Sequence, residues 1–185
     1  SKEEILERIN INRIADILNK IEVKAGDVVM VKAGTIHAIG AGVFICEIQQ
    51  NSNCTYRMYD YDRRDKFGNP RELHVKKALD VVDNHKYIKD NKTEVVIARN
   101  EHFTEERLVQ CKYFEVYKYE VNDEAKITVD EASFVSVLFI NGSGTIETDD
   151  YEKTMEFKAG DSFFVSAGLR SIIVKGQATM VVTRV

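Results

Sequence analysis

His37 is the histidine whose position is most typical of a metal ligand, because it closely follows the Gly34 turn in a β-rich stretch. A zinc site needs three or four ligands, which histidine, cysteine and carboxylate side chains supply. The other histidines show no His-x-His or His-x3-His spacing, and we expect all of them to be solvated: His74, His85 and His102. Further ligands must therefore be carboxylates or come from outside these 185 residues. A lone histidine is also common as an ordinary core or surface residue, so both interpretations of His37 stay open.

Glu47 is a second candidate, because it is a carboxylate within an otherwise apolar run at residues 43–48. Burying a carboxylate among apolar side chains costs free energy unless a cation or a hydrogen-bond donor meets it. One interpretation is that Glu47 ends a strand and points to solvent. The other is a site carboxylate, able to accept protons or to hydrogen-bond a sugar hydroxyl.

Arg57 lies in a stretch of β-branched and aromatic residues, 55–61, which is typical of a strand. Strand alternation places Thr55, Arg57 and Tyr59 on one face. Arg57 is then either a plain surface charge or a permanent cation in a barrel cavity, where it would stabilise an anionic intermediate or bind phosphate. The charged residues that follow are expected to form solvated pairs on a loop: Asp60, Asp62, Arg63, Arg64 and Asp65.

Many short strands would position these candidates. Apolar and β-branched runs separated by Gly, Asn and Asp turns predict strands at 28–31, 43–48, 55–61, 94–98, 114–121, 134–140, 163–165, 171–174 and 179–184. Such a series indicates an all-β sandwich or barrel.

Two helical segments are also predicted. Ser1 and Glu4 form a capping-box pattern at the start of a helix over residues 1–21, which the asparagines near residue 10 break in two. Asn69 as a cap and Pro70 as the first helical residue predict a second helix over 70–83.

An internal repeat is the most informative feature of the chain. Residues 23–39 align without gaps on residues 157–173, with Lys-Ala-Gly-Asp, a valine, Ala-Gly and an isoleucine at identical offsets. So wide a spacing indicates two copies of a domain-sized unit rather than a solenoid. The first copy has His37 where the second has Ser171. If the unit holds a metal, the second copy has lost that ligand.

Composition excludes several classes of protein. Thirty acidic and 26 basic residues give a net charge of −4, which is unsuited to holding a nucleic-acid backbone. No apolar run approaches the roughly 20 residues of a membrane-spanning helix, and the charged N-terminus is no signal peptide. Three cysteines without CxxC spacing indicate reduced thiols in a cytoplasmic protein.

The glycine and histidine pattern ending at His37 resembles the second motif of the cupin superfamily, with Lys32 in place of its usual proline. In the second copy, the run from Ile140 to Ile146 resembles the Gly-x-Gly turn of the first cupin motif, without the His-x-His that follows it. The resemblance implies double-stranded β-helix barrels, one partial and metal-bearing and one complete and metal-free.

Three longer runs closely resemble type I mannose-6-phosphate isomerase of the short, Firmicutes-like kind: residues 33–39, 47–63 and 70–74. The resemblance implies a zinc-dependent isomerase that interconverts mannose 6-phosphate and fructose 6-phosphate through an enediol. It places His37 on the last metal ligand, Arg57 on the active-site arginine and Glu47 on an acidic pocket position. It implies a helical segment at 1–22, the C-terminal part of the catalytic barrel at 23–92 and a second barrel at 93–185.

One departure separates the chain from that family. Members carry an additional N-terminal region with further metal ligands and a substrate-contacting lysine, which these 185 residues lack. We therefore expect a C-terminal portion whose first barrel has an exposed edge, covered by a second copy, a swapped segment or the missing part. Two alternatives stay open: a non-catalytic cupin that binds a sugar or acts in regulation and, less favoured, an oxygen-using metal cupin.

Overall fold

The computed structural model describes residues 1–52, 54–85, 95–148 and 151–185. The chain divides into two compact units, residues 1–89 and 90–185. The domain boundary expected between residues 92 and 93 falls in the segment 86–94, which lies outside the described residues.

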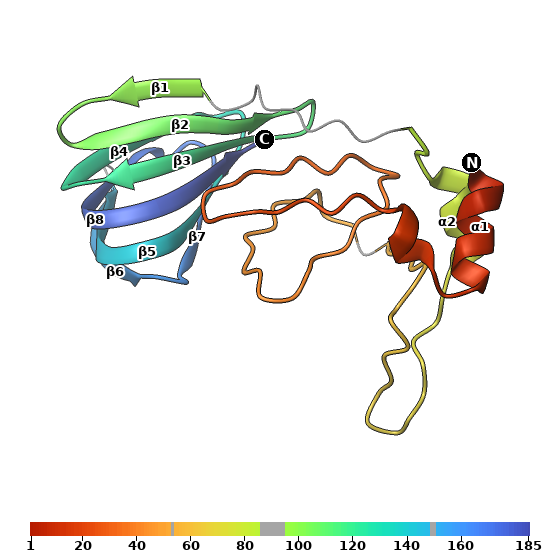
Figure 1. The fold of residues 1–185 in the computed structure, drawn as a ribbon. Coiled ribbons are helices and arrows are strands. Elements are labelled where there is room, and N and C mark those ends of the chain that lie inside the picture. The colour runs from red at the N-terminus through yellow and green to blue at the C-terminus, as the bar shows by residue number, and fades with distance from the viewer. Residues whose placement is uncertain (53, 86–94, 149–150) are drawn as a thin grey trace. The chain divides into compact units, whose positions relative to one another are not determined.

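The second unit is an antiparallel sheet of eight strands in the order β1-β2-β3-β8-β5-β6, with β4 paired to β8 and β7 to β5 (Figure 1). The strands are β1 Val95–Arg99, β2 Phe103–Gln110, β3 Glu115–Val121, β4 Glu124–Val129, β5 Val135–Thr148, β6 Tyr151–Lys158, β7 Ser162–Val165 and β8 Arg170–Arg184. The prediction of a mainly β protein is confirmed. Three of these strands, β2, β4 and β6, were not predicted, because charged residues interrupt their apolar pattern.

β5 and β8 are the longest strands and run side by side over most of their length. Gly144 and Gly176 face each other in the register of this pair. A Cβ at Gly144 would lie 1.9 Å from the carbonyl oxygen of Lys175, and one at Gly176 would lie 2.5 Å from that of Ser143. Only glycine allows the two backbones to approach so closely.

The interior of the second unit is filled by apolar side chains. The core combines inward-facing residues of most strands, among them Ile127, Val137, Val174 and Met180, which are almost completely buried. Burial alternates strictly along β4, as a strand with one solvent-facing side requires. The side chains on the inner face of the sheet therefore pack mainly against other apolar side chains.

The described residues of the first unit contain three short helices, α1 Lys2–Asn10, the 3-10 helix η1 Ile14–Ile17 and α2 Val75–Val81. The predicted capping box is confirmed, because the Ser1 hydroxyl accepts the backbone N–H of Glu4 and the Glu4 side chain accepts the N–H at the cap. The predicted break near residue 10 separates α1 from η1. The apolar faces of these helices form a small core together with Met58 and Val82, which lie outside the helices; its helical members are Ile5, Ile9, Ile14 and Ala78. The longest helix, α1, has nine residues, so no helix in the described ranges is of membrane-spanning length.

Two predictions for the first unit are wrong. Among its described residues, 28–31, 43–48 and 55–61 form no regular strand. A strand exists only with a hydrogen-bonded neighbour, and β-prone sequence cannot supply one by itself. The helix predicted over 70–83 begins only at Val75, because the segment before it is paired with residues 57–64 instead.

The repeat is visible in the backbone of both units. Gly26 and Gly160 have φ angles of +91° and +92°, and Gly34 and Gly168 have +84° and +81°. In each copy an aspartate carboxylate accepts the backbone N–H of a preceding lysine: Asp27 from Lys24 at 3.1 Å, Asp161 from Lys158 at 2.9 Å. The repeated sequence therefore folds into repeated turns.

Candidate functional site

His37 follows a turn that is fixed against the end of α2. The carbonyl oxygen of Gly34 accepts the backbone N–H of Asp83 at 2.9 Å, and a Cβ at Gly34 would lie 2.7 Å from the carbonyl oxygen of Val81. The His37 ring is exposed, and its Nδ1 lies 2.9 Å from the carbonyl oxygen of Thr35. This contact occupies Nδ1, so Nε2 is the ring nitrogen that remains available to a ligand.

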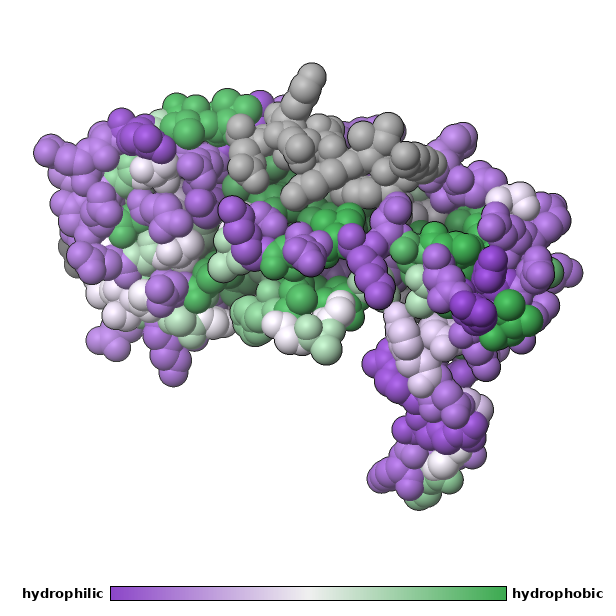
Figure 2. Space-filling view, in the orientation of Figure 1, coloured by the Kyte–Doolittle hydropathy of each residue, from purple (hydrophilic) through white to green (hydrophobic). Residues whose placement is uncertain are grey.

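Glu47 is exposed, and so are the apolar side chains before it, including Phe44 with 95% of its surface accessible. The segment from Val23 to Ile45 carries several such side chains, and Figure 2 shows apolar surface over this part of the chain. Exposed apolar residues gathered on extended backbone indicate a surface that another segment covers.

Arg57 is half-buried and held by the segment that precedes α2. Its Nη1 donates to the carbonyl oxygen of Glu72 at 3.0 Å. Its backbone carbonyl accepts the N–H of His74 at 2.7 Å, and its own N–H donates to Nδ1 of His74 at 3.3 Å. The guanidinium therefore has a defined position, which is what a fixed positive charge in a site requires.

His37, Glu47 and Arg57 all lie in the first unit, outside regular strands. Within the described ranges, no hydrogen bond or ion pair joins any two of them. Their convergence on one site stays a prediction.

The described residues do not make a zinc site by themselves, since nowhere in those ranges do three His, Cys, Asp or Glu side chains gather as a metal needs. His85 is exposed and pairs with Asp83 at 2.6 Å, as expected of a solvated histidine. His74 differs from that expectation, because it is half-buried against Arg57. His37 alone is therefore an incomplete ligand set for a metal.

The prediction that Asp60 is solvated is wrong. Asp60 is 6% exposed, and its carboxylate accepts Nε of Arg71 at 2.7 Å and Nη2 of the same guanidinium. Nη2 of Arg63 lies 3.0 Å from Oδ1. The hydrogen bond from Arg71 lowers the pKa of Asp60 below its ordinary value, against the opposing effect of burial. Alternation with the buried Met58 was the sequence signal that could have revealed it.

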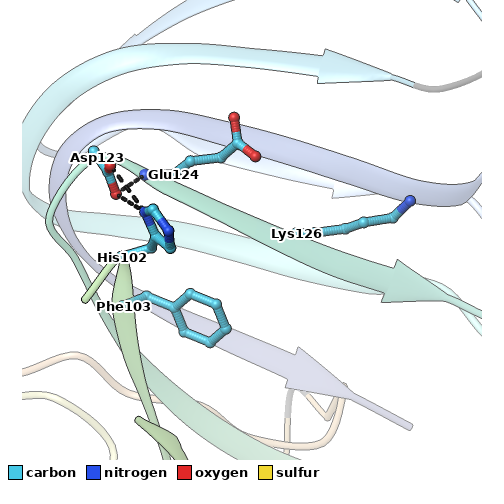
Figure 3. A pocket seen from close by; sticks show the side chains of 5 residues that line it. All are labelled: His102, Phe103, Asp123, Glu124 and Lys126. Carbon is cyan, nitrogen blue, oxygen red and sulfur yellow. Dashed lines mark hydrogen bonds and ion pairs between the residues drawn. The ribbon is translucent and has the colours of Figure 1, made fainter. Parts of the chain in front are cut away.

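A surface pocket in the second unit was not predicted. It measures about 280 Å³ and is lined by His102, Phe103, Asp123, Glu124 and Lys126 (Figure 3). Both carboxylate oxygens of Asp123 lie 2.9 Å from Nδ1 of His102. This pair joins the β1–β2 turn to the β3–β4 turn, alongside a backbone hydrogen bond from Asn122 to the carbonyl oxygen of His102.

The His102–Asp123 pair gives a prediction for pH dependence. The Asp123 hydrogen bond raises the pKa of His102, and the His102 hydrogen bond lowers the pKa of Asp123. The pair's stabilisation is therefore complete from about pH 4 to 6.5 and is lost above that as His102 loses its proton. Replacing His102 with Gln should remove this dependence: in urea titrations, the difference from wild type should be larger at pH 5.5 than at pH 8.5. A difference that grows with pH would contradict it.

Comparison with known proteins adds to this geometry. Residues 104–185 match the family model for the cupin domain of mannose-6-phosphate isomerase. The whole chain aligns with mannose-6-phosphate isomerase ManA of Bacillus subtilis, at 33% identity over 193 residues, and a second Bacillus subtilis relative, YvyI, is 40% identical over 190 residues. The resemblance to the mannose-6-phosphate isomerase family is confirmed.

The likeness extends to three dimensions. A crystal structure of mannose 6-phosphate isomerase from Bacillus subtilis superposes with a TM-score of 0.81 and 32% identity, covering all of this chain. This chain spans only 57% of that structure and 56% of ManA. The mannose-6-phosphate isomerase relatives are thus considerably longer than this chain.

Proposed function

We propose that this chain is the part of a mannose-6-phosphate isomerase that carries Arg57, Glu47 and His37, and that the complete enzyme interconverts mannose 6-phosphate and fructose 6-phosphate. The observation that carries the proposal is the structural likeness of the whole chain to the Bacillus subtilis isomerase. The hydrogen bond from the Arg57 guanidinium to the carbonyl oxygen of Glu72 supports it from within the chain.

The reaction moves one proton from C2 to C1 and one from the C2 hydroxyl to the carbonyl oxygen, so nothing is consumed. A negative charge develops on oxygen in the enediol intermediate. Arg57 stabilises that charge, because a guanidinium held in place needs no reorganisation when the charge appears. Glu47 accepts or returns a proton or orients a sugar hydroxyl. His37 would contribute one ligand to a zinc ion, which would polarise the sugar carbonyl, and carboxylates or residues outside these 185 would complete the ligand set.

The exposed apolar side chains of the first unit support the proposal that a further polypeptide segment packs against it. Val29, Val31 and Phe44 lie on extended backbone that forms no sheet among the described residues. We propose that the polypeptide that makes up the rest of the relatives' length covers these side chains and supplies the hydrogen-bonded strand partners that their segments lack. Pairing with a second copy of the chain is the alternative.

The free cysteines, Cys46, Cys54 and Cys111, support a cytoplasmic enzyme.

Metal analysis of the purified 185-residue chain gives a further prediction. Because His37 has no two metal-binding neighbours among the described residues, the chain alone should retain much less than one zinc per molecule after dialysis. The control is the same chain mixed with a polypeptide that supplies the N-terminal region of a relative. One tightly bound zinc per isolated chain would contradict the prediction.

The isomerase proposal is tested by a coupled assay that converts mannose 6-phosphate to fructose 6-phosphate. The chain alone is expected to be inactive and the complemented chain active. If the complemented preparation takes up zinc and folds, yet shows no turnover, the proposal is wrong. The second candidate, a sugar-binding cupin without chemistry, would then apply if mannose 6-phosphate still binds.

A further inference from the structure

Asp60 lies within a long excursion of the backbone that we call the 57–74 arm (Figure 1). Its two sides run antiparallel: Arg57 pairs with His74, Arg64 with Pro70, and the backbone N–H of Asp65 donates to the carbonyl oxygen of Asn69 at 2.9 Å. Residues 66–69 form the turn at its tip. Asp60 and Arg71 face each other across the arm close to its base.

Asp60 is the only acidic or basic residue that is buried in the described ranges. Both of its carboxylate oxygens are bound by the fork of the Arg71 guanidinium, and Arg63 adds a third nitrogen. A bidentate arginine fixes direction as well as distance, which a single surface ion pair does not do. The Arg71 side chain is 46% exposed, so Asp60 is the buried member of the pair, and removing Arg71 would leave its carboxylate without that compensation.

The backbone next to Asp60 is strained. Tyr61 and Asp62 have φ angles of +55° and +52°, a left-handed conformation that side-chain-bearing residues seldom adopt in succession. Such strain persists only where surrounding contacts hold it, and it gathers at functional sites. The backbone hydrogen bond from Arg63 N–H to the carbonyl oxygen of Asp60 closes this turn, and the Asp60–Arg71 pair ties it to the opposite side of the arm.

A short path connects Asp60 to Arg57. Arg71 is next in sequence to Glu72, whose carbonyl oxygen accepts Nη1 of Arg57 at 3.0 Å. Fixing Arg71 therefore fixes the carbonyl against which the Arg57 guanidinium rests. The hydrogen bonds between Arg57 and His74 hold the backbone of the same two segments. The segment that precedes α2 therefore positions both the backbone and the side chain of Arg57.

We propose that Asp60 is a positioning residue: through Arg71 it holds the 57–74 arm so that the Arg57 guanidinium points into the site. The inference rests on the proposed function for its role in catalysis, whereas the positioning itself is independent of activity. Asp60 touches no reacting atom and acts through Arg71 and the carbonyl of Glu72.

The first test measures positioning directly by NMR of the arginine Nε–H groups in the 185-residue chain. Asp60→Asn should shift the Arg57 resonance and speed its exchange with water. Arg71→Lys, which keeps the charge but loses the fork, should do the same to a smaller degree. The Arg71→Lys variant also provides the test of positioning if the Asp60→Asn variant fails to fold. Asp62→Asn is the matched control, because Asp62 is an exposed partner of Arg64 on the same arm and asparagine tolerates its positive φ.

The second test measures kinetics of the complemented chain with mannose 6-phosphate. Asp60→Asn should lower kcat by roughly 10- to 100-fold, with KM changed much less, since a misplaced charge weakens the transition state more than binding. Arg71→Lys should retain part of the activity and Asp62→Asn all of it.

The outcomes are distinguishable. An unchanged Arg57 resonance in both Asp60→Asn and Arg71→Lys overturns the positioning role, as does wild-type kcat in Asp60→Asn. A wild-type preparation without isomerase activity contradicts the proposed function instead. In that case the NMR comparison still decides whether Asp60 positions Arg57.

Discussion

Replacing Arg57 with Gln is expected to lower kcat of the complemented isomerase by about 100- to 1,000-fold, the loss typical of removing one preorganised group that stabilises a developing negative charge. Glutamine is two bonds shorter than arginine and neutral, so both the permanent charge and the hydrogen bond to the carbonyl oxygen of Glu72 are lost. The hydrogen bonds between the Arg57 backbone and His74 do not depend on the Arg57 side chain, so the fold should be preserved. The measurement is the coupled assay from mannose 6-phosphate to fructose 6-phosphate at saturating substrate.

Two further variants make this result specific. Arg57→Lys keeps the charge without the planar fork and should recover only part of the lost rate. Arg64→Gln is the matched control, because Arg64 lies on the same arm, is half exposed and pairs with the exposed Asp62. Equal losses in Arg57→Gln and Arg64→Gln would show that general surface charge, rather than a site residue, is responsible.

Truncating Phe139 should be the most destabilising single change in the second unit. Its side chain is fully buried, its ring stacks on Phe157 with centroids 3.7 Å apart, and it meets Phe163 edge to face at 5.9 Å. Phe139→Ala removes these contacts and leaves a cavity between β5 and β6. We expect the free energy of unfolding to fall by about 3–5 kcal/mol, measured by urea titration with circular dichroism.

Phe164 provides the control on the neighbouring strand. It is 71% exposed and stacks only on Phe134, with centroids 4.8 Å apart. Phe164→Ala should cost about 1 kcal/mol or less. If the two substitutions had equal effects, the apolar filling of the second unit would not be what stabilises it.

Five of the eight strands in the described part of the second unit were predictable because they are marked by local pattern, whereas β2, β4 and β6 were missed. The runs 114–121 and 134–140 overlap β3 and β5, and the repeat at 157–173 located the turns around β7. Two predicted strands, at 171–174 and 179–184, are one strand, β8, because Gly176 does not end it. A glycine inside a strand pattern suggests a break, whereas the structure uses this one for close approach to β5.

The first unit was less predictable, since a strand depends on a neighbour that may be far away in sequence or in another segment. Val28–Val31 and the run at 43–48 have strand-like composition, yet they remain extended and outside any sheet in the part described. The register of the 57–74 arm could not be predicted either. The Asp60–Arg71 pair joins its two sides, and charge pairs across a chain reversal leave no periodic signal in the sequence.

The candidate site was predicted mainly by family resemblance. Residue types alone left two interpretations for each of His37, Glu47 and Arg57. The structure adds a defined hydrogen-bond setting for Arg57 and shows that His37 and Glu47 are exposed. Asp60 was missed because charged residues clustered on a loop usually are solvated.

The most direct test of the central claim is an NMR titration of the complemented chain with mannose 6-phosphate, with mannose as the control ligand. The account predicts that side-chain signals of His37, Glu47 and Arg57 shift together along one binding curve, while the signals of His102 in the second unit stay unchanged. Shifts confined to one of the three, or to the pocket around His102, would contradict a shared site.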